Sequence, residues 1–298
     1  MNTIRGIIPP LVTPFDAEGR IDEAAHRREV RFMAGCGVHG VAVGGSTGEG
    51  HTLSSEEVRL LTGAAVEEAA GRVPVIAGII TNSTRQALER AGAVADLQVA
   101  ALQVTPPHYL FRPDDDSLLR HFAVIAEATG IPVIIYNVVP WCYLSPQALC
   151  RILAEAEGVV GVKQSATDLK LVADLMLMVR DLPGGKQVSI LSAVDALLYP
   201  SFCLGAHGSV AALLTAAPEL CVRLWEAVQS GDHRTAEALH RQLLRIWNAI
   251  DGPNLPANVK TAMRLQGREG GFPRAPMPPS SAAQARAIGD ALAQNRQA

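Results

Sequence analysis

Lys163 closes a continuously apolar run, GVVGVKQS, at residues 158–165. Lysine is scarce in this chain, because only four of its 26 basic residues are lysines, namely Lys163, Lys170, Lys186 and Lys260. An amine held between apolar walls loses hydration, which favours its neutral form, and a neutral amine can attack a carbonyl carbon to form a Schiff base. The alternative is a lysine that reaches solvent or pairs with an acid, and position alone leaves both open.

A tyrosine occupies the matching place in the preceding apolar run, IPVIIYNV, at residues 131–138. The hydroxyl of Tyr136 could carry protons to and from an intermediate formed on Lys163. The alternative is an ordinary core tyrosine.

The loop GGSTGEG at residues 44–50 holds Ser46 and Thr47 between glycines. Small residues and exposed backbone N–H groups suit a carboxylate or another anion. The loop does not match a phosphate loop, because neither G-K-[ST] nor G-x-G-x-x-G is complete. The alternative is a simple tight turn.

Eight short apolar runs position these side chains and predict strands. They span residues 6–13, 40–46, 73–79, 99–105, 131–138, 158–164, 188–193 and 206–213. Runs that are apolar throughout, rather than alternating with polar residues, are typical of a parallel sheet covered on both faces. The carboxyl ends of such strands are where barrel enzymes build their active sites.

Most of these runs are followed by a segment whose apolar residues recur at helical spacing. Ser54 with Glu57 predicts a capping box, and Ser145 followed by Pro146 predicts a second helix start. The alternation predicts an α/β fold, a (β/α)8 TIM barrel, with the catalytic barrel at residues 1–216. Residues 217–298 are predicted to form a C-terminal helical extension packed on the barrel.

Composition excludes several other classes of protein. The chain is 48% hydrophobic and 18% charged with a net charge of -3, and it has no basic stripe, so nucleic acid is not an expected partner. Its five cysteines include no C-x-x-C pair, which argues against a zinc knuckle or a disulfide framework. The proline-rich start makes a poor signal peptide and no run is long enough to span a membrane, so a cytoplasmic location without membrane attachment is expected.

Three motifs, taken together, carry a family resemblance. GSTGE at 45–49, YN at 136–137 and GVKQS at 161–165 occur in the order and spacing of the dihydrodipicolinate synthase / N-acetylneuraminate lyase family. This family consists of class I aldolases, which form a Schiff base. The resemblance covers nearly the whole chain.

The resemblance implies a role for each matching residue. Lys163 would form an imine with a 2-oxo acid such as pyruvate, and Tyr136 would shuttle protons and touch the substrate carboxylate. Ser46 and Thr47 match the carboxylate-binding pair, with Thr47 also in the proton relay. Val210 lies in the segment whose backbone lines the pocket.

The same resemblance implies the partners of the reaction. A 2-oxo acid and an aldehyde would be the substrates, and neither a metal nor an organic cofactor would be needed. The imine acts as an electron sink, so the enamine derived from it can add to an aldehyde or reverse that step. A homo-oligomer, either a tetramer or a dimer, is the expected assembly.

The chain departs from the family pattern at three places. Trp141 stands where synthases of lysine biosynthesis carry an arginine for aspartate semialdehyde, although Arg112 could supply a cation. His108 stands where a tyrosine commonly reaches a neighbouring subunit, so His108 or Tyr109 could serve the relay, or His108 could simply pack at an interface. SAVDA at 192–196 lacks the sugar-binding motif of sialic acid lyases.

Trp141 leaves two further interpretations open. It could form an aromatic wall of the acceptor pocket, which suits a less polar aldehyde. Alternatively it packs the loop and never meets substrate.

Four functions are therefore open. The first is a Schiff-base lyase or aldolase acting on pyruvate or a related 2-oxo acid, with an unassigned acceptor. The second is 4-hydroxy-tetrahydrodipicolinate synthase, which condenses pyruvate with aspartate semialdehyde. The third is a non-catalytic 2-oxo acid sensor, against which the intact Lys163, Tyr136 and hydroxyl pair argue. The fourth is a phosphate-binding barrel of other chemistry, against which the missing glycine-rich loop argues.

Overall fold

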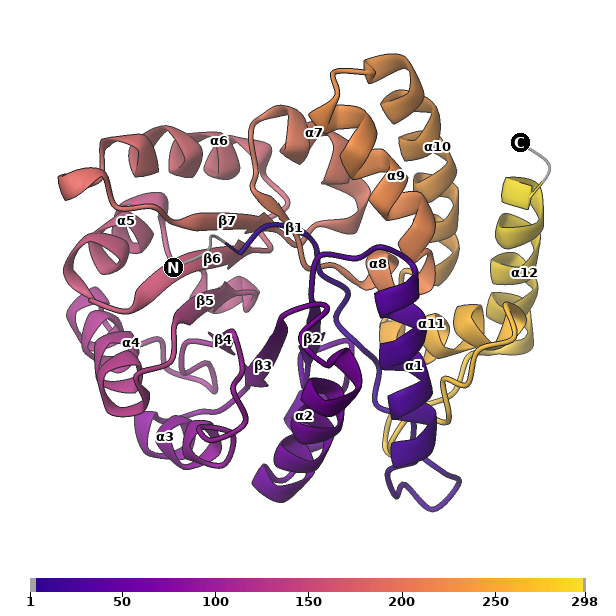
Figure 1. Cartoon of the computed structure of the whole chain (residues 1–298), viewed down its shortest axis with the longest axis horizontal. Helices are drawn as coiled ribbons and strands as arrows, with labels where there is room; N and C mark the ends of the chain where they lie inside the picture. Colours follow the sequence, from indigo (N-terminus) through magenta and orange to yellow (C-terminus); the bar gives the residue numbers. More distant parts are fainter. Residues whose placement is uncertain (1–3, 297–298) are drawn as a thin grey trace.

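The computed structural model describes residues 4–296 and forms within them an eight-stranded parallel sheet. The hydrogen-bonded order is β1-β8-β7-β6-β5-β4-β3-β2, so neighbours in sequence are neighbours in space. Figure 1 shows the strands gathered at the centre with helices around them. The strands are β1 (Gly6–Ile7), β2 (Val41–Val43), β3 (Val75–Ile79), β4 (Ala101–Val104), β5 (Val133–Asn137), β6 (Val159–Gln164), β7 (Ser189–Ser192) and β8 (Gly208–Ser209).

The sheet closes on itself just beyond β1. Pro10 forms a parallel bridge with Ala42 of β2. The amide of Ala42 donates to the carbonyl of Pro9 at 2.9 Å, and the amide of Leu11 donates to the carbonyl of Ala42 at 2.8 Å. Proline has no N–H to give, so at this seam it contributes only carbonyls. The closed ring confirms the predicted (β/α)8 barrel.

Every strand lies inside its predicted run, but the first and last are much shorter than predicted. The run 6–13 contains only the two-residue β1, because Pro9 and Pro10 remove two ladder donors. The run 206–213 contains only the two-residue β8, because the chain turns into a helix at Ala212.

Helices cover the outside of the barrel. Ser54 caps the second helix in a capping box with Glu57, and Ser145 caps the fifth with Pro146 in its first turn, as predicted. The barrel helices are α1 (Glu23–Gly35), α2 (Ser55–Ala69), α3 (Thr84–Gly92), α4 (Asp115–Thr129), α5 (Pro146–Glu155), α6 (Leu169–Met178), α7 (Leu198–Cys203) and α8 (Ala212–Ala216).

Two apolar cores stabilise the barrel. The larger lies between the strands and the surrounding helices. The smaller fills the inside of the ring and consists of Ile8, Ala42, Ile76, Ala101, Ile134, Leu191 and Val210, each at most 1% exposed. The barrel is therefore packed rather than open, and polar side chains that point inward lie on a solid apolar floor.

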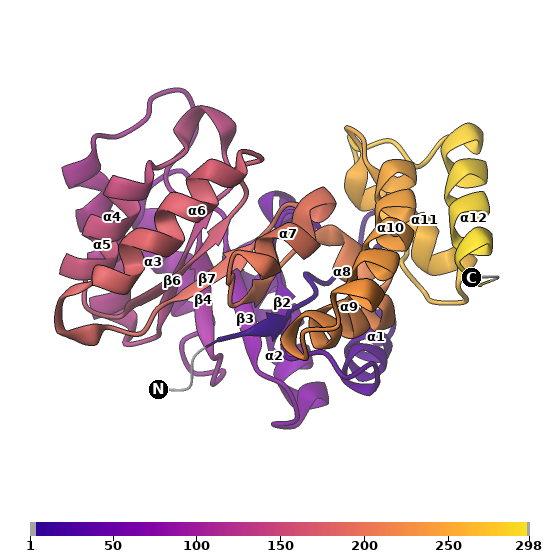
Figure 2. The same cartoon turned by 90° about the horizontal axis from the view of Figure 1, so that it is seen from above.

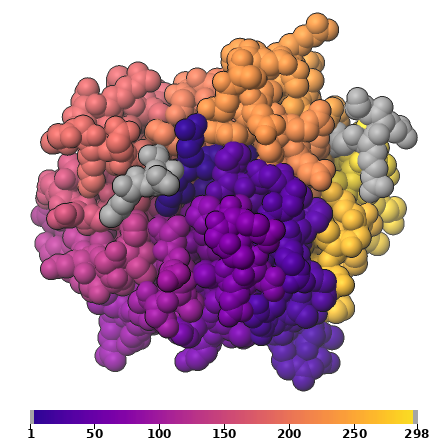
Figure 3. Space-filling view, in the orientation of Figure 1, coloured from indigo at the N-terminus to yellow at the C-terminus, as the bar shows by residue number. Residues whose placement is uncertain are grey.

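Within residues 4–296, four helices follow the barrel and lie to one side of it, as Figures 1 and 2 show. They are α9 (Pro218–Gln229), α10 (His233–Ile250), α11 (Leu255–Leu265) and α12 (Ala282–Arg296). In Figure 3 the yellow C-terminal surface adjoins the indigo surface of the N-terminal segment. No helix within residues 4–296 combines the length and the apolar character needed to cross a membrane.

Candidate active site

Lys163 and Tyr136 lie side by side at the carboxyl ends of β6 and β5. They are register partners in the sheet, so the pairing of the two strands brings the side chains together. The Nζ atom of Lys163 lies 3.9 Å from the centroid of the Tyr136 ring. Lys163 is 4% exposed and Tyr136 is 2% exposed. An amine is thus held against an aromatic face at the mouth of a packed barrel.

Burial and the absence of an ion pair within residues 4–296 exclude the alternative interpretations of Lys163, a surface lysine or one paired with an acid. Its side chain does not reach bulk water. Among residues 4–296, no acid forms an ion pair with it, whereas Lys170 pairs with Asp174 and Lys260 pairs with Glu49. Lys163 is therefore neither a surface lysine nor one half of a salt bridge.

A hydrogen-bonded amide pair fixes the ends of the two strands beside this contact. Asn137 donates from Nδ2 to Oε1 of Gln164 at 3.1 Å, and its own Oδ1 accepts from the amide of Leu144 at 2.9 Å. Gln164 also accepts from the amide of Ala166 at 3.1 Å. Because Asn137 and Gln164 follow Tyr136 and Lys163 directly, these bonds restrict the backbone that carries both.

The turn at residues 44–50 meets the tyrosine. The hydroxyl of Tyr136 donates to Oγ of Ser46 at 2.9 Å, across 90 residues of sequence. The amides of Gly48 and Gly50 both donate to the carbonyl of Gly45 at 3.0 Å, so the turn is tightly wound. Ser46 is exposed and Thr47 is 8% exposed. The structure brings together Lys163, Tyr136 and Ser46, with Thr47 adjacent to Ser46 in the chain.

Close backbone contacts explain the glycines of this turn. Gly44 has a φ of 71°, a conformation that favours glycine. A Cβ atom at Gly50 would lie 1.9 Å from the carbonyl oxygen of Gly44, and one at Gly78 of β3 would lie 2.4 Å from the same oxygen. The turn can therefore settle onto β3 only where side chains are absent.

Val210 lies directly after β8 and is fully buried in the inner core. Its amide donates to the carbonyl of Ser192 at the end of β7, at 2.9 Å. This bond places the backbone of Val210 at the carboxyl ends of β7 and β8, on the same side of the barrel as Lys163.

Comparison with known proteins shows which family this chain belongs to. The sequence profile of the Dihydrodipicolinate synthetase family matches residues 3–295. The chain belongs to this family. A 4-hydroxy-tetrahydrodipicolinate synthase of Methanopyrus kandleri is 38% identical over 278 residues, covering 92% of this chain and 90% of that protein. The corresponding protein of Bradyrhizobium diazoefficiens is 35% identical over 276 residues, covering 92% and 91%.

Solved structures agree with this assignment. Dihydrodipicolinate synthase from Thermotoga maritima superposes with a TM-score of 0.93 at 27% identity, and the match covers 100% of both chains. The protein is accordingly a lyase of the dihydrodipicolinate synthase family.

The family positions at the rim of the site are less enclosed. Trp141 lies in the 3-10 helix Pro140–Cys142, is 64% exposed, and donates from Nε1 to the carbonyl of His108 at 2.9 Å. His108 is half-buried, with its ring bonded to the carbonyl of Pro106, and Tyr109 is 72% exposed. Arg112 pairs with Asp115 on the surface. Trp141 and His108 are joined by a hydrogen bond, and their roles stay predictions.

Asp195 is a buried acid near Lys163 that the sequence patterns did not single out. It is 7% exposed, and its Oδ1 accepts from the amide of Leu213 at 2.5 Å. Burial raises the pKa of Asp195 to about 7, while the Leu213 N–H and the charge of Lys163 act in the opposite direction. Only its place after the seventh apolar run could have pointed to it.

Gln103 is a second polar residue that sequence reasoning missed. It lies in β4, is fully buried, and neither its Oε1 nor its Nε2 has a hydrogen-bond partner among residues 4–296. Its Nε2 lies 3.7 Å from where a Cβ on Gly45 would stand. A polar residue in the middle of an apolar strand, ALQV, was the available signal.

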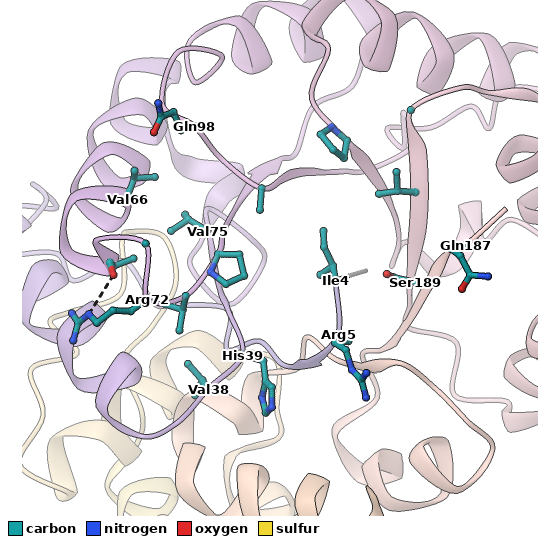
Figure 4. Close-up of a pocket in the computed structure, with 18 of the residues that line it drawn as sticks. Ile4, Arg5, Val38, His39, Val66, Arg72, Val75, Gln98, Gln187 and Ser189 are labelled. Atoms are coloured by element: carbon teal, nitrogen blue, oxygen red, sulfur yellow. Dashed lines mark hydrogen bonds between the residues drawn. The ribbon is translucent and has the colours of Figure 1, made fainter. Parts of the chain in front are cut away.

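A separate hollow of about 1180 Å³ opens at the other end of the barrel, shown in Figure 4. Its lining includes the first residues of strands, such as Val75 and Ser189, together with Arg5 and His39. Lys163 and Tyr136 stand at the carboxyl ends of their strands, so this hollow is distinct from the candidate active site.

Proposed function

We propose that this family member is a class I lyase or aldolase that forms an imine between Lys163 and pyruvate or a related 2-oxo acid. The observation that carries the proposal is the buried contact of Lys163 Nζ with the Tyr136 ring, whose hydroxyl bonds to Ser46. The amine that would form the imine thus lies next to a phenol, and the phenol is hydrogen-bonded to a hydroxyl. The acceptor aldehyde is unassigned.

The reaction balances without any further reagent. The unprotonated amine of Lys163 adds to the C2 carbonyl of the 2-oxo acid. Loss of water, with a proton taken up on the nitrogen, gives the protonated imine. Removal of a proton from C3 pushes electrons into the imine and gives the enamine. The enamine carbon then bonds to the aldehyde carbon, whose oxygen takes up a proton, and water releases the product and restores the amine. The reverse sequence cleaves the same carbon–carbon bond.

Each neighbouring residue has a part in this scheme. Tyr136 accepts and returns the protons, since its hydroxyl is already hydrogen-bonded toward Ser46. Ser46 and Thr47 bind the substrate carboxylate, with Thr47 also in the proton relay, and the backbone at Val210 lines the pocket. Trp141 forms an aromatic wall for the acceptor, and His108 or Tyr109 completes the relay.

Exchange of the pyruvate methyl protons tests this function without knowledge of the acceptor. In deuterated water the wild type should exchange the methyl protons of pyruvate for deuterium, because the enamine forms reversibly. Proton NMR measures this exchange as loss of the methyl signal. Lys163→Met should abolish the exchange. Pyruvate binding without exchange in the wild type would favour the 2-oxo acid sensor, and neither binding nor exchange would overturn the proposal.

A second candidate is 4-hydroxy-tetrahydrodipicolinate synthase, which condenses pyruvate with aspartate semialdehyde. The relatives from Methanopyrus kandleri and Bradyrhizobium diazoefficiens are 4-hydroxy-tetrahydrodipicolinate synthases, which favours this candidate. Trp141 argues against it, because an indole cannot replace a bidentate arginine for a carboxylate.

Assay with pyruvate and aspartate semialdehyde separates the two candidates. The wild type should be weak, and Trp141→Arg should improve the condensation. Robust wild-type activity with this pair would favour the second candidate and would mean that Trp141 does not exclude the semialdehyde.

A further inference from the structure

Glu49 joins the turn that carries Ser46 and Thr47 to the C-terminal extension. It is 0% exposed and accepts a hydrogen bond from Nζ of Lys260 in α11 at 2.5 Å, across 211 residues of sequence. Its other oxygen accepts from the amide of Arg274 at 2.8 Å. Lys260 is 1% exposed and donates again, to the carbonyl of Phe272 at 2.7 Å.

The cluster is fully paired, which explains how two charges can be buried there. An isolated buried charge is strongly unfavourable, whereas a paired and hydrogen-bonded one is tolerated. Burial lowers the pKa of Lys260, and the charge and hydrogen bond of Glu49 oppose that change. Such pairs add little net stability compared with apolar residues, so their value lies more in fixing geometry.

The geometry that Glu49 fixes is that of the turn. Glu49 has φ 56° and ψ 33°, a left-handed conformation that is unfavourable for a residue with a side chain. Its amide donates to the carbonyl of Ser46 at 3.0 Å. The preceding Gly48 is held from the other side, because Oγ1 of Thr13 donates to its carbonyl at 2.7 Å. The anchoring carboxylate thus lies two residues from Thr47 and three from Ser46.

We propose that Glu49 and Lys260 are positioning residues for the substrate carboxylate, and that the helical extension is in this way a working part of the active site. The proposal rests on the proposed function. Neither side chain touches substrate. They act through the turn, by holding Ser46 and Thr47 at a fixed distance from Tyr136.

The experiment measures the pyruvate dependence of methyl-proton exchange for Glu49→Gln, Lys260→Met and the double variant. The double variant removes both charges, so no unpaired buried charge remains and folding is favoured. All three should raise the KM for pyruvate by about tenfold or more, because a displaced turn binds the carboxylate poorly. The rate at saturating pyruvate should fall much less, since Lys163 and Tyr136 are untouched.

A matched control comes from a second buried ion pair between barrel and extension. Glu29 of α1 pairs with Arg268, and the two side chains are 3% and 7% exposed. This pair also attaches the extension, but the hydrogen bonds of Arg268 go to Glu29 and to the carbonyl of Thr215, and none within residues 4–296 goes to the turn. Glu29→Gln should therefore lower the stability to urea and leave the KM for pyruvate unchanged.

The outcomes separate the two claims. If the wild type exchanges protons but the stable double variant keeps the wild-type KM, or if Glu29→Gln raises KM equally, the positioning role is refuted while the proposed function stands. If the wild type neither exchanges protons nor binds pyruvate, the proposed function fails and the positioning role fails with it.

Discussion

At the residue scale, the proposed chemistry depends on one buried amine and the phenol ring beside it. Lys163 lies against the Tyr136 ring and forms no ion pair within residues 4–296, although its charge acts on the buried Asp195 nearby. The hydroxyl of Tyr136 donates to Ser46. The amine can therefore be consumed by a carbonyl without breaking an ion pair. The phenol can exchange its proton with a group that approaches from the Ser46 side.

Removing the phenol should slow the proton steps while sparing amine attack. Tyr136→Phe should reduce the rate of methyl-proton exchange by about 10²- to 10⁴-fold, the usual contribution of a positioned acid or base. Ser46→Ala is the matched comparison, because it removes the acceptor of the bond and leaves the phenol, so its main effect should be on KM. Exchange at the wild-type rate in Tyr136→Phe would show that another group carries the proton.

Asp195 makes stability depend on pH in a defined direction. Its pKa is raised from 3.8 to about 7, so between these values the folded state holds a proton that the unfolded state has released. The contribution of this residue to stability therefore falls as pH rises through that window and is constant above it. Asp195→Asn has no titrating group at this position. Its free energy of unfolding should therefore rise relative to that of the wild type between pH 4.5 and 7.5, by on the order of 3 kcal/mol.

Urea denaturation of both proteins at these two pH values measures the difference. The comparison between wild type and variant cancels the contributions of other groups, such as the buried His26 and His121, whose pKa values burial lowers to about 4. If the difference in the free energy of unfolding between wild type and variant is the same at both pH values, the assignment of a buried, protonated Asp195 is contradicted.

At the scale of elements, the site depends on how closely one turn can approach one strand. The turn at 44–50 rests on β3 because Gly78 leaves room for the backbone of Gly44 and Gly45. Ser46 of this turn then accepts the hydrogen bond of the Tyr136 hydroxyl. Two neighbouring strands supply the amine and phenol, and a distant turn supplies the hydroxyls.

Gly78→Ala should therefore weaken pyruvate binding. The new Cβ would lie 2.4 Å from the oxygen of Gly44 and 2.9 Å from the nitrogen of Gly45, so the turn must move. We expect the KM for pyruvate to rise by about tenfold or more. Gly63→Ala in α2 is the control, because its Cβ would meet only Leu97 methyl groups at 3.9 and 4.0 Å and KM should not change. An unchanged KM in Gly78→Ala would contradict the close fit.

At the scale of the whole molecule, an exposed apolar group stands beside the site. Tyr109, Leu110, Phe111 and Trp141 are 72%, 66%, 85% and 64% exposed. Monomeric proteins rarely leave such groups together in water. The expected homo-oligomer would cover them.

Analytical ultracentrifugation checks this expectation. The wild type should sediment as a dimer or tetramer, and the double change Leu110→Glu and Phe111→Glu should shift it toward the monomer. Leu60→Glu, at another exposed leucine, should leave the mass unchanged. A monomeric wild type, or an unchanged mass in the double variant, would contradict the role given to this surface.

The sequence was sufficient to predict the barrel and to point to residues that the structure brings together at the strand ends, although their catalytic roles stay predictions. Each strand lies within a largely apolar run, and Lys163, Tyr136 and Ser46 stand at the ends of such runs, where residue type and position agree. The short β1 and β8 were not foreseen, because their ends depend on which carbonyls close the ring. Glu49 and Lys260 were not foreseen either, since a contact across 211 residues leaves no local pattern.

Reductive trapping tests the central claim most directly. The purified protein is incubated with pyruvate and sodium borohydride, and its intact mass is measured. Peptide mass spectrometry then locates the modified residue, and the Lys163→Arg variant is treated in parallel. We predict one reduced pyruvate adduct per chain, located on Lys163 and absent from the variant. An unmodified wild type, or an adduct on Lys170, Lys186 or Lys260 instead, would contradict it.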